Sequence, residues 1–250
     1  MLIYGLTDIG MVRKENQDFY AIRTDFPSGH AVGVVCDGMG GPAGGERASK
    51  IAVATYMERL ESLLQADMTT EELELASAEA VLTANRAVWS EAQKLGYQSM
   101  GTTLVSAILS GADALITNVG DSRAYYAVRG NIDCVTRDHS LVQDMVERGE
   151  ITEEEARYHP KRNLITRALG PDENVRCDTY FRHMEPQSSL LLCSDGLVNT
   201  LADGEILTVL ENNPPNRCPE RLISVSKRRG APDNVTVVLI RNSAEGGATL

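Results

Sequence analysis

Histidine and cysteine are scarce in this chain, and neither is spaced as a set of zinc ligands. The 250 residues include four histidines and five cysteines, and no two cysteines form a CxxC motif. Zinc is not expected, because its protein sites use closely spaced cysteines and histidines. Most of the cysteines fall in or beside apolar runs, where reduced, buried thiols are expected. Structural or exposed roles are expected for the scattered histidines, His30, His139, His159 and His183.

Long apolar runs and positive charge are also lacking. No run approaches the roughly 20 apolar residues that a membrane span needs, and the first residues lack the basic and apolar segments of a signal peptide. Lysine and arginine total 24 against 35 acidic residues, so the formal net charge is -11 at pH 7. Such a chain repels the phosphates of nucleic acids and anionic membranes. We therefore expect a soluble, cytoplasmic protein with no nucleic-acid or membrane partner.

The length and composition fit one domain with a large core. At 250 residues, of which 42% are hydrophobic, the chain is long enough for one large domain or two small ones. It contains no internal repeat and no low-complexity tract. We favour a single domain over residues 1–242, followed by a flexible tail over 243–250.

The apolar pattern predicts strands, then two long helices, then more strands. A capping box, Thr69 with Glu72 three residues later, predicts the start of the second helix. Strands are expected at 2–7, 19–24, 31–36 and 235–240, with two more before residue 203, and helices at 43–65, 70–94, 141–148, 153–158 and within 203–229. A four-stranded antiparallel meander is expected at 102–109, 112–119, 123–128 and 131–136 because its turns are short. This order favours α+β layers over alternating βαβ units.

Aspartates lie beside glycine or asparagine in four short motifs. These are Asn16-Gln17-Asp18, Asp37-Gly38-Met39-Gly40-Gly41, Ser194-Asp195-Gly196 and Asp233-Asn234. The last three each adjoin an apolar run, so strand ends that converge at one sheet edge would gather the carboxylates. Crowded carboxylates raise each other's pKa, and hard cations with oxygen ligands would neutralise them. Any one of these aspartates alone is more simply a turn cap, but together they predict Mg²⁺ or Mn²⁺.

The glycine run after residue 37 has two competing interpretations. Residues 38–43 formally match the GxGxxA dinucleotide fingerprint, but the acidic residue expected about 20 positions later would fall inside the long helix rather than at a strand end. A phosphate loop needs Lys and Ser or Thr after its second glycine, whereas Glu46 and Arg47 follow Gly45. Neither nucleotide motif is favoured.

Taken in order, the motifs resemble those of the type 2C metal-dependent serine/threonine protein phosphatases in their compact bacterial form. The resemblance covers nearly the whole chain, and it implies a four-layer α-β-β-α sandwich of two antiparallel sheets flanked by helix pairs. The metals would lie at one edge between the sheets. Besides the aspartate motifs, the matching segments are Thr7-Asp8-Ile9-Gly10, Arg13, Gly101-Thr102-Thr103, Asn118-Val119-Gly120-Asp121-Ser122-Arg123 and Asp138-His139-Ser140.

The resemblance also implies a role for individual residues. Asp37 would bridge two metals, with the Gly38 carbonyl on the second, while Asp195 and Asp233 would complete the first. These three aspartates form the implied catalytic set. Asp18 would hold the second metal directly or through water, and Asp121, with Asp195, would bind a third, weaker ion. Arg13 would bind the substrate phosphate through the planar fork of its guanidinium.

The implied reaction is hydrolysis of phosphoserine and phosphothreonine in proteins. A water activated by two Mn²⁺ or Mg²⁺ ions would attack phosphorus without a phosphoenzyme intermediate. The implied partners are phosphorylated proteins made by a serine/threonine kinase, and a monomer is expected. Two alternatives remain open: a catalytically weak pseudophosphatase that acts as a regulatory binding module, and a hydrolase of small phosphoesters.

The sequence departs from the family pattern around the site. Met39 and Pro42 stand where relatives have a histidine thought to protonate the leaving group, so that proton would come from water or from His159. Gln17 replaces a carboxylate found in some relatives, and Asn199 replaces an aspartate of the third-metal site. The segment 141–169 matches the family's flap, whose locally basic stretch, 157–163, suits a phosphorylated peptide.

Overall fold

The computed structural model describes residues 1–41, 44–97 and 99–243. Pro42 lies outside these ranges. So does the tail predicted for 243–250, apart from its first residue.

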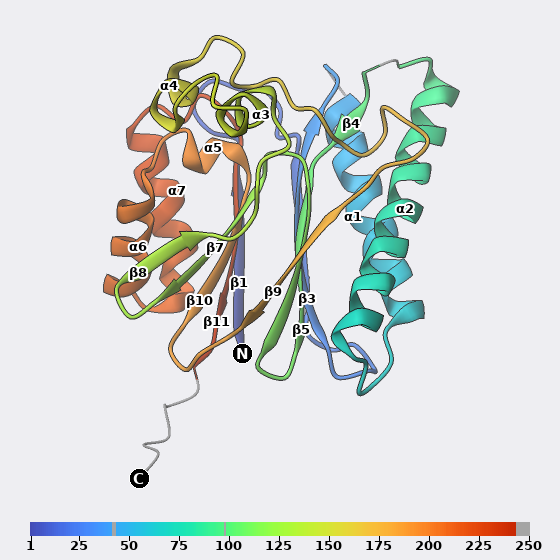
Figure 1. The fold of residues 1–250 in the computed structure, drawn as a ribbon, viewed down its shortest axis with the longest axis vertical. Helices are drawn as coiled ribbons and strands as arrows, with labels where there is room; N and C mark the ends of the chain where they lie inside the picture. The colour runs from blue at the N-terminus through green and yellow to red at the C-terminus, as the bar shows by residue number, and fades with distance from the viewer. Residues whose placement is uncertain (42–43, 98, 244–250) are drawn as a thin grey trace.

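Two antiparallel sheets form the centre of the molecule (Figure 1). In the five-stranded sheet the order is β1 (Leu2–Asp8), β11 (Val235–Arg241), β10 (Ser189–Cys193), β7 (Arg123–Val128) and β8 (Asn131–Cys134). In the six-stranded sheet it is β2 (Asp18–Arg23), β3 (Ala31–Met39), β5 (Leu104–Ser110), β6 (Asp113–Val119) and β9 (Asp178–His183), with the short β4 (Gly101–Thr102) paired to β3.

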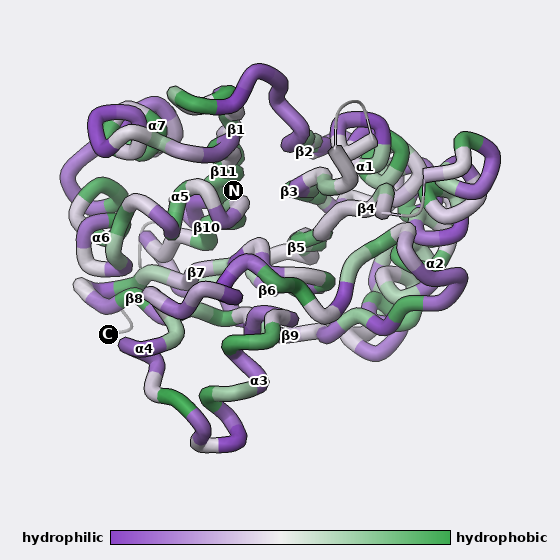
Figure 2. Tube along the Cα trace, turned by 90° about the horizontal axis from the view of Figure 1, so that it is seen from above, coloured by the Kyte–Doolittle hydropathy of each residue, from purple (hydrophilic) through white to green (hydrophobic). Residues whose placement is uncertain are grey.

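Helices cover the outer face of each sheet (Figures 1 and 2). The pair α1 (Gly44–Leu63) and α2 (Thr70–Leu95) lies on the six-stranded sheet, and α6 (Asp203–Asn212) and α7 (Cys218–Arg228) lie on the five-stranded sheet. The short elements are α3 (Leu141–Glu147), α4 (Glu153–Tyr158), α5 (Asp195–Val198) and the 3₁₀ helix η1 (Pro215–Arg217). The predicted α-β-β-α sandwich is confirmed. In the described ranges, no helix combines the length and apolarity of a membrane span.

Three apolar cores hold the four layers together. The inner core lies between the sheets and includes Val35, Ile116 and Leu192. Each outer core lies between a sheet and its helices. Tyr56 of α1 belongs to one of them and Leu222 of α7 to the other. Strands with both faces in a core have no polar alternation, which explains why the sequence showed them as continuous apolar runs.

The structure corrects the prediction of a single four-stranded meander. Its first two strands, β5 and β6, belong to the six-stranded sheet, whereas β7 and β8 belong to the other. The chain crosses between the sheets at residues 120–122, where Gly120 has φ +107°. Strand β3 also runs to Met39, so Asp37 lies inside a strand rather than in the turn after it. The capping box at the start of α2 is confirmed, since Thr69 and Glu72 exchange hydrogen bonds.

Candidate metal centre

A cleft of about 500 Å³ opens at the edge between the sheets. Four of the five predicted metal-binding aspartates line it, namely Asp37, Asp121, Asp195 and Asp233, together with Arg13 and Gly38. Asn163 and Ile165 add part of the flap, the segment 141–169 between β8 and β9, to its wall. Residues that lie more than 200 positions apart in the sequence therefore line one cavity.

Strand pairing places Asp18 next to Asp37, which it faces across the β2–β3 ladder. Asp18 is only 4% exposed. Ser194 Oγ and Thr236 Oγ1 each donate a hydrogen bond of 2.7 Å to its Oδ2. Its other oxygen, Oδ1, is buried without a hydrogen-bond partner. One carboxylate oxygen is thus fixed by the opposite sheet, and the other is left for a ligand.

The main chain of Asp37 is clamped by two threonines. Thr103 Oγ1 accepts from the Asp37 amide at 2.9 Å, and the Thr103 amide donates to the Asp37 carbonyl at 2.9 Å. Thr102 Oγ1 donates to the same carbonyl at 2.8 Å. The next residue must be glycine, because a Cβ on Gly38 would lie 2.1 Å from the carbonyl oxygen of Gly45. This contact lets the start of α1 approach β3 closely.

Electrostatics disfavour the charged forms of these carboxylates. Burial, then repulsion from Asp18 and Asp195, raises the pKa of Asp37 well above its ordinary value. Burial is also the largest cause at Asp121, whose pKa is about 8, and at Asp18, whose pKa is about 7. Burial and repulsion from Asp233 raise the pKa of Asp195 as well. Nearby cations would remove this cost, because an opposite charge favours the ionised form.

The donor set fits hard divalent cations. The candidate ligands are carboxylates and the Gly38 carbonyl, which are the oxygen donors that Mg²⁺ and Mn²⁺ prefer. Asp195 Oδ1, like Asp18 Oδ1, is buried without a hydrogen-bond partner. Within the described ranges, no three His, Cys, Asp or Glu side chains are already arranged as an ion-holding group. The two unpartnered carboxylate oxygens are available to an ion.

Two of the aspartates that line the cleft accept hydrogen bonds from Arg13 and Asn199. Arg13 Nη2 donates to Asp233 Oδ2 at 2.7 Å, a contact that raises the pKa of Arg13. Asn199 Nδ2 donates to Asp195 Oδ2 at 3.1 Å. Arg13 thus lines the cleft, where its partner is a predicted metal ligand and not a substrate. Its side chain is 56% exposed and has room to turn toward a substrate.

Asn234 organises the loop that carries Arg13, a role that the sequence analysis missed. Its Nδ2 donates to the carbonyls of Ile9 and Glu15, both at 2.9 Å, and its Oδ1 accepts from the Gln17 amide at 2.8 Å. The asparagine next to Asp233 was noted in its motif, but pattern alone does not reveal contacts across more than 200 residues.

His159 does not contribute to this cleft. The residues lining the cavity do not include it, and its Nδ1 accepts from the Lys161 amide at 3.2 Å. Met39 does line the cleft but has no proton to donate. In this structure neither residue is placed to donate a proton to a group bound in the cleft.

Comparison with known proteins points to one family. The sequence model described as "Protein phosphatase 2C" matches residues 12–213. The serine/threonine phosphatase stp of Listeria welshimeri is 34% identical over 244 residues, which cover 96% of each chain. The solved serine/threonine phosphatase of S. agalactiae has a TM-score of 0.88 at 34% identity and covers 95% of this chain and 98% of its own. The solved catalytic domain of the phosphatase PstP, in complex with two manganese ions, has a TM-score of 0.81 at 32% identity, with 95% and 96% covered.

Proposed function

The chain belongs to the protein phosphatase 2C family, and from that premise we propose how its cleft works. Its activity is that of a metal-dependent serine/threonine protein phosphatase, acting on phosphorylated proteins. The observation that carries the assignment of residues is the gathering of Asp37, Asp121, Asp195 and Asp233 with Arg13 in one cavity. We assign the residues 1–242 to this single catalytic domain.

The ions are proposed to be two Mn²⁺ or Mg²⁺. Asp37, Asp195 and Asp233 would hold the first, and Asp37, the Gly38 carbonyl and Asp18 the second. When bound, such ions supply positive charge against the phosphoryl oxygens and a water of lowered pKa as nucleophile. A third, weaker site would use Asp121 with Asp195. Asn199 already donates to Asp195 there, and an amide side chain lacks the charge of the aspartate it replaces.

The protein's own side chains bind and orient the substrate. Arg13 would exchange its bond to Asp233 for bonds to the phosphate, since a guanidinium can donate two parallel N–H groups to phosphate oxygens. Asn163 and Ile165 place the flap against the same cavity, where it can contact the peptide around the phosphorylated residue. Met39 gives no proton, so the leaving serine or threonine oxygen would take its proton from water.

We also propose the source of the substrates, the oligomeric state and the cellular compartment. The natural substrates would be products of a serine/threonine kinase, and the protein would act as a monomer. All five cysteines are free thiols, which suits a reducing compartment such as the cytoplasm.

Hydrolysis assays on the purified protein test this function. Chelated protein should not release phosphate from a phosphothreonine peptide or from p-nitrophenyl phosphate, and added Mn²⁺ should restore both reactions. Hydrolysis of the aryl ester alone would indicate a small-phosphoester hydrolase. Peptide binding without hydrolysis at any Mn²⁺ or Mg²⁺ concentration would indicate the pseudophosphatase and contradict the proposal.

A further inference from the structure

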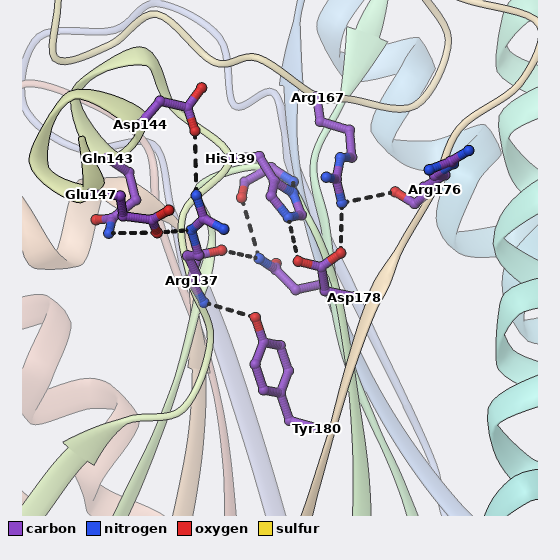
Figure 3. Close-up of polar contacts among 11 residues, drawn as sticks. Arg137, His139, Gln143, Asp144, Glu147, Arg167, Arg176, Asp178 and Tyr180 are labelled. Atoms are coloured by element: carbon purple, nitrogen blue, oxygen red, sulfur yellow. Dashed lines mark hydrogen bonds and ion pairs between the residues drawn. The ribbon is translucent and has the colours of Figure 1, made fainter.

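His139 lies at the base of the flap, outside the cleft, and is 5% exposed. Its Nδ1 accepts a hydrogen bond from the Gly120 amide at 3.0 Å, while its own amide donates to the Gly120 carbonyl at 2.9 Å. Because Nδ1 accepts, the ring proton is on Nε2, which donates to Asp178 Oδ2 at 3.0 Å (Figure 3). One neutral imidazole therefore connects two separate segments.

The first segment is the turn that carries Asp121. His139 holds both main-chain polar groups of Gly120, the residue directly before Asp121. Gly120 adopts φ +107°, and a Cβ there would lie 2.6 Å from Thr103 Cγ2, so the turn has little freedom to shift. The direction of the Asp121 carboxylate into the cleft depends on this backbone.

The second segment is the end of the flap. The carbonyl of His139 accepts from the Thr166 amide at 2.8 Å. Asp178 Oδ1 accepts from Arg167 Nη1 at 2.7 Å, as Figure 3 shows. Although partial burial opposes it, the hydrogen bonds from His139 and Arg167 lower the pKa of Asp178. His139 thus holds the end of the flap at Thr166 through its main chain and at Arg167 through Asp178. The flap starts at residue 141, only two residues after His139.

We propose that His139 is a positioning residue that couples the flap to the Asp121 turn, so that closure of the flap on a phosphopeptide and placement of Asp121 depend on one side chain. The proposal rests on the proposed function of the cleft. Burial lowers the pKa of His139, which keeps Nδ1 free to accept. Gly120 directly follows β6, and Asp178 is the first residue of β9, where it pairs with Asn118 of β6. Asn118 Nδ2 also donates to the Gly120 carbonyl at 3.3 Å, whereas the Gly120 amide is held by His139.

Two substitutions separate the two halves of this contact. His139→Asn keeps an acceptor near the position of Nδ1 and removes the donor to Asp178. His139→Gln keeps a donor near the position of Nε2 and removes the acceptor for Gly120. We expect His139→Asn to raise KM for a phosphothreonine peptide about tenfold, the scale of one lost buried hydrogen bond, and to leave KM for p-nitrophenyl phosphate unchanged.

We expect the opposite pattern for His139→Gln. The Gly120 amide should exchange with solvent about tenfold faster in the metal-free protein, and the weakest calorimetric Mn²⁺ site should lose about tenfold in affinity. KM for the peptide should change less than in His139→Asn. The matched control is His183, which bonds to Asp113 at 2.7 Å on the exposed far end of β9. His183→Asn and His183→Gln should leave all these readouts unchanged.

Two results would overturn the coupling. One is wild-type behaviour of both His139 variants, and the other is a parallel loss in every readout that follows the fall in melting temperature, which indicates a merely structural role. If the variants do not fold, the ¹⁵N spectrum of the wild-type protein tests the proposal. It should show an unprotonated Nδ1 at His139 and a Gly120 amide protected from exchange. A protonated Nδ1 would contradict the proposal. Failure of the phosphatase function itself would show separately, as a wild type that does not hydrolyse the peptide with Mn²⁺.

Discussion

At the scale of single residues, the carboxylates in and beside the cleft combine burial with repulsion. Asp18 and Asp121 have pKa values of about 7 and about 8, against an ordinary value of 3.8. Each therefore opposes folding once it is ionised. Ionised residues that lower the stability of the metal-free protein are typical of functional sites, because the negative charge that destabilises the empty fold attracts a cation.

This repulsion predicts a pH dependence of the metal-free protein. Between about pH 4 and pH 8 the folded chain retains protons on Asp18 and Asp121 that the unfolded chain has released. The free energy of unfolding must therefore fall as pH rises through this window. Thermal melts in chelator from pH 5 to pH 9 should show the decline, and Asp121→Asn should flatten it. A melting temperature that rises steadily from pH 5 to pH 8 would contradict the prediction.

Arg13 is expected to act on substrate affinity. Arg13→Ala should raise KM for a phosphopeptide by about ten- to a hundredfold, with a smaller effect on kcat if the guanidinium binds ground and transition states similarly. Mn²⁺ affinity should not fall, because the substitution frees Asp233. Lys14→Ala, a neighbouring cation in the same cleft, is the control and should change KM less. Collapse of Mn²⁺ binding in Arg13→Ala would mean that the arginine supports the metal site instead.

At the scale of elements, one loop and one asparagine determine where Arg13 lies. Asn234 is 4% exposed, and its three hydrogen bonds fix the segment between β1 and β2. The segment therefore depends on a residue next to β11, at the other end of the chain.

Asn234→Ala should destabilise the protein and weaken substrate binding together. Removing the three bonds should cost about 2–4 kcal/mol in the free energy of unfolding, because buried main-chain groups lose their partners. Urea denaturation gives this value, and steady-state kinetics should show a raised KM. Asn131→Ala, which removes a single bond of 3.3 Å within an exposed hairpin, should stay within about 0.5 kcal/mol of wild type. Equal effects of the two substitutions would show that Asn234 does not organise the loop.

The sequence predicted the elements and the candidate residues better than their contacts. Apolar runs and the Thr69 capping box located most strands and both long helices, since these signals are local. The crossing at Gly120 was missed, because hairpin-length turns also occur where a chain changes sheets. The facing of Asp18 and Asp37 depends on strand register, and the bond between Arg13 and Asp233 depends on tertiary packing. Neither leaves a local pattern in the sequence.

At the scale of the whole molecule, the inner core joins two halves that each have their own outer core. Val35 and Ile116 of one sheet pack in the same cluster as Leu192 and Val238 of the other. The cleft is formed by both halves, so separation of the sheets would dismantle it.

We expect the two halves to unfold together. Trp89 lies on α2 and reports on one half through its fluorescence, while far-ultraviolet circular dichroism reports on all elements. In urea the two transitions should coincide, which is the test of cooperative unfolding. A fluorescence transition at clearly lower urea would show that residues 1–242 comprise two separately stable units.

Titration of the chelated protein with Mn²⁺ in a calorimeter tests most directly whether the aspartate cluster is the metal centre of this phosphatase. Wild type should bind at least two ions per chain, with release of protons at pH 7 because Asp18 and Asp121 ionise on binding. Asp37→Asn should lose this binding and remain folded, with a metal-free melting temperature no lower than that of wild type, since a repelling charge is removed. Unchanged Mn²⁺ binding and turnover in Asp37→Asn would contradict the account.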